Sequence, residues 1–590
     1  MENILKTPYD YSEIVQNKKK LSRLMTENRK LKSIRVAILS GSTIGEIKNI
    51  LSLFLLKNGI KAEFYIGNYN RYFEESVFEN RELEKFGPDY IYIHTSNKNL
   101  NGKNFSKISE KEVLEEVNNE FLKLKKIWEN LRNKYNCEII QNNFEWPQNR
   151  IFGNLEGTIF FGEINFINKL NLKISKFISE NNYIHINDIA YLASKIGLDK
   201  WYSTKDWYMY KYAFGVDNIP IVCKNISNII KSVYGKSKKC IVLDLDNTLW
   251  GGIIGDDGIN GIVLGNETAE GQAYLEFHKY LIKLKDRGIL LAISSKNTMD
   301  NALLGLSHPN SILKKDDFVD IQADWELKTE HIKKIAKNIN ILEDSIVFID
   351  DNPFECDIVA KNLPDVEVII CDKIEAIIEK IDREGFFEII NFDKSDLDRN
   401  KYYKDNIKRE KLKDNYLDYD EYLRSLEMKA YISNFKDIDI ERITQLINKT
   451  NQFNLTTKRL NGVEVENKKV SEKFITLQGR LVDKFGDNGI VSLMIGQIKE
   501  EQCDINLWVM SCRVFKRNFE YAMFDKFIKE CIKKNIKTIC GKYIRTNKNK
   551  YVENLYRTLG FKLEKEEDGI EYWMLYNIDK YKFKNNVIEV

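Results

Sequence analysis

Two carboxylates stand at the end of an apolar run near the middle of the chain. Asp244 and Asp246 follow the run 240–243, which predicts a buried strand. Carboxylates two residues apart at a strand end can converge on one small space. One could attack a phosphoryl group while the other moves protons, in a reaction that Mg²⁺ assists. The sequence therefore predicts phosphoryl transfer at this point.

Three more elements follow in the order that such a site requires. Ser295 follows a second apolar run, Lys328 precedes a predicted helix, and Asp350 and Asp351 follow a third apolar run. A hydroxyl and a lysine can bind phosphate oxygens, and a carboxylate pair can complete a Mg²⁺ site. Each group alone could be a cap, a turn or a surface lysine. Their joint order favours one site.

This order resembles the haloacid dehalogenase superfamily of phosphotransferases. The resemblance implies that Asp244 is the nucleophile, that Asp246 is the general acid/base, and that Ser295 and Lys328 bind phosphate. The implied Mg²⁺ ligands are Asp244, Asp246, Asp350 and Asp351.

Longer strings are more specific. The stretch 244–258 (DLDNTLWGGIIGDDG) and the stretch 348–353 (FIDDNP) are similar to the FkbH-like family. That resemblance implies a Mg²⁺-dependent enzyme that takes D-1,3-bisphosphoglycerate, a phosphorylated three-carbon metabolite, and releases phosphate. It also implies delivery of a glyceryl unit to the phosphopantetheine of an acyl carrier protein, for polyketide-type assembly.

The length and composition of the chain limit the classes of protein to which it can belong. The chain has 590 residues, long enough for two to four domains, and Lys+Arg 91 against Asp+Glu 88 gives a net charge of +3. The charges are interleaved, so no nucleic-acid or membrane partner is expected. No apolar run is long enough to span a membrane, and nine scattered cysteines without a CxxC motif suit a reduced cytoplasm.

Residues 1–232 predict an α/β domain with a parallel sheet, since apolar strands alternate with helical stretches. The first turn, Ser40-Gly41-Ser42-Thr43, resembles the SGNH-hydrolase fold, in which a nucleophilic serine follows the first strand. Ser42 or Thr43 would occupy that place. The chain lacks the family's GDS and DxxH motifs, and His185, the only late histidine, is interpreted as structural. We therefore expect a non-hydrolytic domain.

Residues 233–375 predict the phosphotransferase domain, a Rossmann-like sheet with its site outside the carboxyl ends of the strands. The glycine-rich stretch 250–271 is long enough for a hairpin flap but too short for a cap domain. An open site of this kind suits a macromolecular acceptor. Residues 376–428 predict a charged, mainly helical connector.

Residues 429–590 predict an α+β domain that resembles the GNAT-type acyltransferase fold. In that fold the backbone of an R/Q-x-x-G-x-G/A loop binds the pyrophosphate of coenzyme A. Arg513 opens the matching stretch, but Lys516 and Asn518 fill the two glycine positions, and side chains there obstruct close approach. Arg513, Lys516 and Arg517 are the expected cofactor-binding residues, with phosphopantetheine phosphate as a ligand.

Two departures leave alternatives open. Ser294 stands where many FkbH-like relatives have a cysteine, and the glycine positions near Lys516 are filled. Cys512 is another thiol that could carry an acyl group, although a small buried residue is the simpler interpretation. The alternative function is a plain Mg²⁺-dependent phosphatase of a small phosphorylated metabolite with inert flanking domains. A non-enzymatic scaffold is disfavoured because the acidic set is complete.

Overall fold

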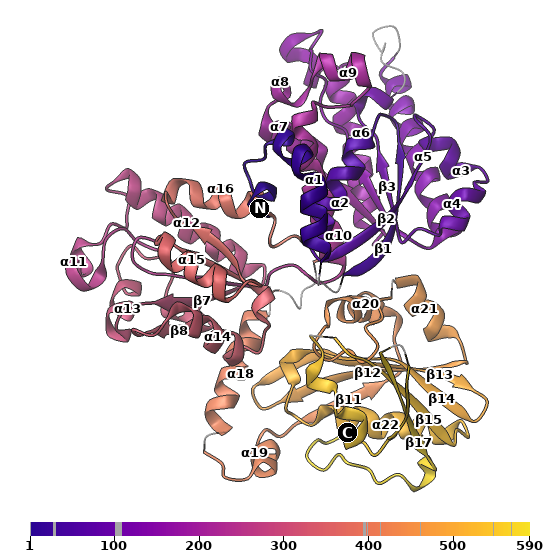
Figure 1. Cartoon of the computed structure of the whole chain (residues 1–590), viewed down its shortest axis with the longest axis vertical. Helices are drawn as coiled ribbons and strands as arrows, with labels where there is room; N and C mark the ends of the chain where they lie inside the picture. Colours follow the sequence, from indigo (N-terminus) through magenta and orange to yellow (C-terminus); the bar gives the residue numbers. More distant parts are fainter. Residues whose placement is uncertain are drawn as a thin grey trace. The chain divides into compact units, whose positions relative to one another are not determined.

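A computed structural model of the chain describes residues 2–27, 31–100, 109–392, 397, 399–413, 415–460, 462–546, 548–567 and 569–590. The chain divides into two compact units. The first contains residues 1–232 and 388–391, and the second contains residues 233–387 and 392–590. The first unit holds one β-sheet and the second holds two (Figure 1).

The first unit is built on a parallel sheet in the order β2-β1-β3-β4-β5. Its strands are β1 (Lys32–Ser40), β2 (Ile60–Ile66), β3 (Tyr90–His94), β4 (Glu138–Asn142) and β5 (Ile184–Asn187). Every residue of β3 is buried. A central strand covered on both faces explains why this segment is mainly apolar, with His94 at its end, and does not alternate between apolar and polar residues.

Helices cover both faces of this sheet (Figure 1). On one face, apolar side chains of α5 (Glu110–Tyr135) and α6 (Glu163–Ser179) form a core with Ile91 and Ile93. A capping box fixes the start of α5: the Ser109 hydroxyl accepts from Glu112 N–H, and the Glu112 carboxylate accepts from Ser109 N–H. The other α-helices of this unit are α1 (Tyr11–Thr26), α2 (Gly45–Lys57), α3 (Tyr72–Val77), α4 (Arg81–Phe86), α7 (Ile189–Ile196), α8 (Leu198–Trp201), α9 (Thr204–Tyr210) and α10 (Ile219–Val233).

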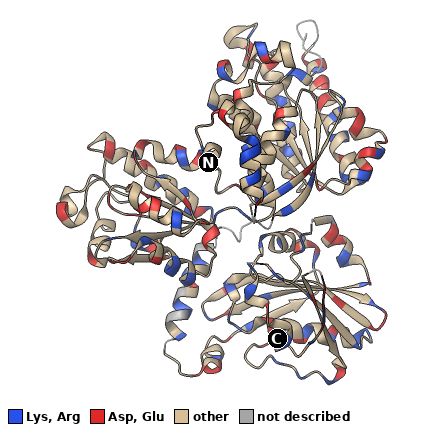
Figure 2. Cartoon of the chain, in the orientation of Figure 1, with Lys and Arg blue, Asp and Glu red and all other residues tan. Residues whose placement is uncertain are grey.

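Acidic and basic residues are interspersed along the helices and strands of both units (Figure 2). Helix α5 carries both acidic and basic residues, while Leu124, Ile127 and Trp128 on the same helix are buried. Most charged positions of α5 therefore form the solvated side of an amphipathic helix, although Glu120 and Arg132 are buried. No helix in the described part of the chain has the length and apolar composition of a membrane span.

The second unit begins with a parallel sheet in the order β10-β9-β6-β7-β8. The strands are β6 (Cys240–Leu243), β7 (Leu290–Ser295), β8 (Asp320–Ala323), β9 (Ile346–Asp350) and β10 (Glu367–Ile370). Alternate residues face two cores. Val242 and Phe348 pack on the side of α14 (Lys328–Asn338) and α15 (Pro353–Asn362), whereas Leu243 packs on the side of α12 (Ala269–Asp286) and α16 (Ile374–Glu384).

The stretch after β6 is not the hairpin that the sequence predicts. It contains α11 (Ile254–Gly261), and a single antiparallel bridge between Gly251 and Val263 closes it. Gly258 interrupts the helix with φ +65°, a conformation that glycine adopts without strain. The flap also packs beside α13 (Met299–Leu306), and no cap domain is inserted between β6 and β7.

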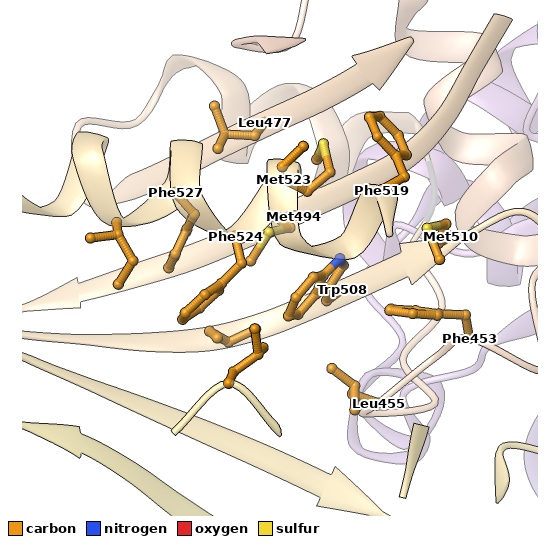
Figure 3. Close-up of a cluster of buried hydrophobic side chains, with 14 of the residues drawn as sticks. Phe453, Leu455, Leu477, Met494, Trp508, Met510, Phe519, Met523, Phe524 and Phe527 are labelled. Atoms are coloured by element: carbon orange, nitrogen blue, oxygen red, sulfur yellow. The ribbon is translucent and has the colours of Figure 1, made fainter. Parts of the chain in front are cut away.

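The last sheet is mixed, in the order β11-β12-β13-β14-β15-β17-β16. Its strands are β11 (Lys429–Ser433), β12 (Phe474–Asp483), β13 (Gly486–Lys499), β14 (Gln502–Met510), β15 (Thr538–Ile544), β16 (Lys562–Glu567) and β17 (Ile570–Tyr576). Only β14 and β15 pair in parallel, and only near their starts. Helix α22 (Phe519–Lys533) packs on this sheet, where Phe524 stacks on Trp508 at 5.7 Å between ring centroids (Figure 3).

The connector contains α18 (Arg399–Lys413) and α19 (Tyr419–Ser425), while residues 393–396, 398 and 414 lie outside the described residues. Helix α18 is joined to the last sheet by buried charge. Arg409 and Arg517 both pair with Asp483, at 2.7 and 2.9 Å. The remaining α-helices of this part are α20 (Ile440–Lys449), α21 (Gly462–Val470) and α23 (Leu555–Thr558). The predicted α/β class, with parallel sheets followed by an α+β part, is confirmed.

Candidate active site

The residues predicted to act on phosphate meet at the carboxyl ends of β6, β7 and β9. Asp244 directly follows β6, and its backbone N–H donates to the Ile349 carbonyl of β9 at 3.0 Å. Asp350 ends β9, and Ser295 ends β7. Because carboxyl ends of parallel strands share one edge of the sheet, residues over a hundred positions apart come together.

Lys328 brings positive charge to this edge from the first turn of α14. Its ammonium lies 2.7 Å from Asp244 Oδ2 and also pairs with Asp350 Oδ2. Burial alone would lower the pKa of Lys328, but the charges of Asp244 and Asp350 outweigh burial and raise it. The lysine therefore stays protonated and stabilises the ionised carboxylates.

Three carboxylates form a group that fits a divalent cation. One oxygen each of Asp244, Asp350 and Asp351 lies within 4.8 Å of the others. Asp244 Oδ1 is buried and has no hydrogen-bond partner among the described residues. Burial, followed by the charge of Asp244, raises the pKa values of Asp350 and Asp351. Mg²⁺ prefers such oxygen ligands and would relieve this repulsion, so the residues present fit the ion.

Asp246, which the resemblance also assigns to the metal, is engaged differently. Oδ1 accepts hydrogen bonds from Trp250 Nε1 at 2.9 Å and from Ile254 N–H at 3.0 Å, and Oδ2 accepts from Asn297 Nδ2 at 3.1 Å. These bonds orient the side chain outside the three-carboxylate group. Burial raises the pKa of Asp246, which suits a group that must donate a proton.

The structure adds two residues to which the sequence analysis gave no role. Asn297 and Trp250 hold the Asp246 carboxylate. Their signal in the sequence was position alone, since Asn297 lies two residues after Ser295 and Trp250 lies four after Asp246. Lys296, between Ser295 and Asn297, pairs with the buried Glu355 on α15 at 2.6 Å, which ties the end of β7 to the helix after β9.

Comparison with known proteins agrees with this geometry. Residues 35–231 match the family described as FkbH, N-terminal domain. A crystal structure of the N-terminal part of the protein BF1531 from Bacteroides fragilis, containing a phosphatase domain complexed with Mg, matches at 27% identity and a TM-score of 0.59. The match covers 64% of this chain and 99% of that chain. The expected resemblance to the FkbH-like family is confirmed over residues 35–231.

Weaker matches go to N-acetyltransferases. The ribosomal-protein-S18-alanine N-acetyltransferase from Escherichia coli matches at 14% identity and a TM-score of 0.21, covering 25% of this chain and 94% of that chain. The PaiA N-acetyltransferase from Thermoplasma acidophilum in complex with coenzyme A matches at 13% identity and a TM-score of 0.20. The match covers 25% of this chain and 99% of that chain. Scores this low carry no inference. No curated protein sequence matched the chain.

In the first unit, the turn that resembles the SGNH-hydrolase fold is buried except at Thr43, which is half-buried. The Ser42 hydroxyl is buried without a hydrogen-bond partner among the described residues, and Thr43 Oγ1 donates to the Tyr210 carbonyl at 2.6 Å. His185 lies on β5 and pairs with Glu138 on β4 at 2.9 Å. That cross-strand contact gives the histidine a structural role.

The C-terminal residues predicted to bind a cofactor are held by protein contacts. Arg517 is buried against Asp483, and it also donates to the Arg513 carbonyl at 2.7 Å. The Lys516 backbone N–H donates to the Tyr551 hydroxyl at 3.1 Å, and Tyr419 donates to the Lys516 carbonyl. Side chains of the protein thus occupy the loop where backbone groups would meet a pyrophosphate.

Cys512 is the one cysteine that is not buried. It lies in the wall of a cavity of about 100 Å³ whose lining includes Arg513, Lys449 and Asn340. Asn340 Nδ2 donates to the Cys512 carbonyl at 3.1 Å, and the Tyr403 hydroxyl lies 3.8 Å from Sγ. The thiol has room for a small ligand beside it.

Proposed function

We propose that this chain is a Mg²⁺-dependent phosphatase of the haloacid dehalogenase type whose nucleophile is Asp244. The observation that carries the proposal is the state of its carboxylate. Oδ2 is held by Lys328 at 2.7 Å, while Oδ1 is buried without a hydrogen-bond partner among the described residues. Lys328 therefore fixes one oxygen, while no hydrogen bond among the described residues holds the oxygen that would attack phosphorus.

The residues of the chain divide the reaction between them. Asp244 attacks the phosphoryl group, and Asp246 donates a proton to the leaving oxygen. Asp246 then takes a proton from water, which attacks the aspartyl phosphate and releases phosphate. The Ser295 hydroxyl and the Lys328 ammonium stabilise charge on the phosphoryl oxygens. When bound by Asp244, Asp350 and Asp351, Mg²⁺ supplies further positive charge at those oxygens.

We propose D-1,3-bisphosphoglycerate as the substrate, with an acyl carrier protein as acceptor of the glyceryl unit. The carrier thiol bonds to the acyl carbon and the acyl phosphate leaves as inorganic phosphate, whereas Asp244 removes the other phosphate, which is an ester. The resemblance of the stretches 244–258 and 348–353 to the FkbH-like family supports this substrate. The short flap supports a macromolecular acceptor, because α11 and one bridge make up the whole insertion after β6. The product would feed polyketide-type assembly.

A second candidate is a plain phosphatase of a small phosphorylated metabolite. The contacts that fill the loop 513–518 favour it, because they leave the C-terminal sheet without an open pyrophosphate cradle. The test is the intact mass of a phosphopantetheinylated carrier protein incubated with the chain, Mg²⁺ and fresh 1,3-bisphosphoglycerate. A glyceryl-sized gain that Asp244→Asn abolishes supports loading. Phosphate release without a gain supports the second candidate.

A further inference from the structure

The cavity beside Cys512 carries more basic than acidic side chains in its lining. Its volume is about 100 Å³, several times what one water molecule needs. The basic residues of the lining are Lys239, Arg442, Lys449 and Arg513, and its acidic residue among the described ones is Asp344. An excess of positive charge around a small hollow favours an anionic ligand.

Helix α20 supplies two of these cations from one face. Arg442, Leu446 and Lys449 all line the cavity, and they stand at positions i, i+4 and i+7 of the helix. Residues with this spacing share one side of a helix. Both cations of α20 therefore lie on the side that faces the cavity.

A short pairing brings the segment after α20 to the end of β14. The Met510 N–H donates to the Phe453 carbonyl at 3.2 Å, and Asn454 forms a bridge with Val509. Phe453 and Met510 both lie at this end of the buried cluster (Figure 3). The pairing thus brings Arg513, three residues beyond Met510, to the same cavity as the end of α20.

The positive charge of Arg513 is held in a desolvated position. Arg513 is 7% exposed, and its guanidinium lies 4.4 Å from the ring centroid of Tyr402 on α18. The ring face stabilises the cation without neutralising it. Because a desolvated charge is screened little by water, it attracts an anion more strongly than an exposed one does.

The acidic residue of the lining does not cancel this charge. Lys548, from the segment after β15, forms an ion pair with Asp344. Burial alone would raise the pKa of Asp344, but the charges of Lys548 and Lys239 help to lower it. The carboxylate therefore has its own cationic partner outside the basic group of α20 and Arg513.

The cavity touches the edge of the phosphatase sheet that lies opposite to Asp244. Lys239 directly precedes β6, and Asp344 lies two residues before β9, so both stand at the amino ends of strands. Asp244 follows the other end of β6, and a strand of this length spans roughly 13 Å. A small ligand in the cavity therefore does not reach the phosphatase carboxylates.

We propose that this cavity binds the phosphate group of a small phosphate ester, with Arg442, Lys449 and Arg513 as its charge partners. A phosphate ester carries close to two negative charges at neutral pH, so it matches several cations better than a carboxylate does. Arginine also presents paired N–H groups that fit phosphate oxygens. The inference is independent of the proposed phosphatase, because Asp244 and its partners do not line the cavity.

The experiment titrates glycerol 3-phosphate into the full chain in EDTA and measures the heat of binding. Without Mg²⁺ the carboxylates of the phosphatase site repel a dianion, so the heat reports binding at the cavity. Arg442→Gln and Lys449→Gln should each weaken binding by about 10-fold or more, as the loss of a charged hydrogen bond usually does. Lys473→Gln, the same change at an exposed lysine of the same domain, is the matched control and should bind like the wild type.

Three results would overturn the proposal in different ways. An absence of binding to the wild type, or one affinity shared by all four proteins, would remove the site. Glycerate binding as tightly as glycerol 3-phosphate would refute the choice of a phosphate. Phosphopantetheine binding more tightly than glycerol 3-phosphate would refute the small ester and assign the cavity to the arm of a carrier protein.

Cys512 gives a local measurement that needs no variant. It lines the same cavity and is the one cysteine that is not buried. Glycerol 3-phosphate at about ten times its Kd should slow alkylation of Cys512 by iodoacetamide about 10-fold, because only the empty cavity admits the reagent. Peptide mapping by mass spectrometry follows the reaction. An unchanged rate would overturn the proposal even where a variant does not fold, and hydrolysis of p-nitrophenyl phosphate with Mg²⁺ would still test the phosphatase separately.

Discussion

At the scale of single residues, a conservative substitution can test the proposed role of Asp244 as the nucleophile. Replacing Asp244 by Asn keeps the shape of the side chain but removes the nucleophile, so phosphate release should fall by at least about 10⁴-fold. The measurement is phosphate released from p-nitrophenyl phosphate at saturating Mg²⁺. Asp300→Asn, the same change at an exposed position on α13, is the matched control and should keep full activity. Substantial turnover by Asp244→Asn would contradict the proposed nucleophile.

Lys328 offers a second test, because it neutralises carboxylates that otherwise repel one another. In Lys328→Met, Asp244 and Asp350 lose the ammonium that pairs with both. We expect a loss of about 10²-fold in activity, and a larger rise in melting temperature on adding Mg²⁺ than the wild type shows. Thermal unfolding with and without Mg²⁺ measures this.

The control for that experiment is Lys296→Met. Lys296 pairs with Glu355 rather than with an aspartate of the site. Its removal should therefore leave the response of the melting temperature to Mg²⁺ unchanged. An equal response in the two variants would show that Lys328 does not neutralise the carboxylate group.

The sequence predicted the identity of the residues at this edge better than their contacts. Acidic residues that directly follow apolar runs can be recognised in the sequence, so Asp244 and Asp350 were predicted from this pattern. The hydrogen bonds that turn Asp246 towards Trp250 and Asn297 depend on how the flap folds back, and no local pattern encodes that path. The contact of 3.2 Å between Ser294 Oγ on β7 and His331 Nδ1 on α14 depends on how the helix packs against the sheet, which the sequence does not give.

At the scale of elements, the flap shows where reasoning from local sequence fails. Glycines at 251, 252, 255, 258 and 261 predicted a hairpin, but the structure has α11 closed by one bridge. Contacts with α13 decide the outcome. A Cβ added at Gly305 of α13 would lie 2.5 Å from Cη2 of Trp250, so the helix approaches the indole as closely as glycine allows.

Gly305→Ala should therefore displace Trp250, the donor to Asp246. We expect the free energy of unfolding to fall by about 1–3 kcal/mol, as overpacking usually costs, together with a drop in kcat. Chemical denaturation and steady-state kinetics measure the two effects. Gly45→Ala, where a Cβ meets nothing within 4 Å, should change neither. Unchanged kinetics in a destabilised Gly305→Ala would mean that Trp250 does not control Asp246.

At the scale of the whole molecule, alternation of apolar strands and helices was enough to predict the parallel sheets, because each βαβ segment carries its own signal. The first unit has the parallel sheet that this alternation predicts, and every residue of its strand β3 is buried. The burial of a side chain by segments that are distant in the sequence was not predictable. Glu145, for example, lies in the irregular stretch after β4 and is nevertheless 0% exposed.

The burial of Glu145 couples the stability of the first unit to pH. Its Oε2 accepts a long bond from Asn97 N–H at 3.4 Å, and Oε1 is buried with no partner that meets hydrogen-bond geometry among the described residues. Tyr202 and the charge of Lys98 lower the pKa of this carboxyl, but burial outweighs them. Burial raises the pKa of Glu145 from 4.5 to about 7. The folded state therefore holds the proton more tightly than the unfolded state, so this group's contribution is complete below pH 4.5 and is lost as pH rises through 7.

Glu145→Gln keeps the shape of the side chain without the charge, so it should remove this loss of stability at high pH. Above pH 7 the variant should be more stable than the wild type by up to about 3 kcal/mol, the free energy of a pKa shift of this size. Near pH 4.5 the two proteins should unfold alike, because the wild-type carboxyl is then protonated when folded. Thermal unfolding of the full chain across this range, followed on the transition of residues 1–232, makes the comparison. A constant difference at every pH would mean that the amide changes packing rather than charge, and it would refute the coupling.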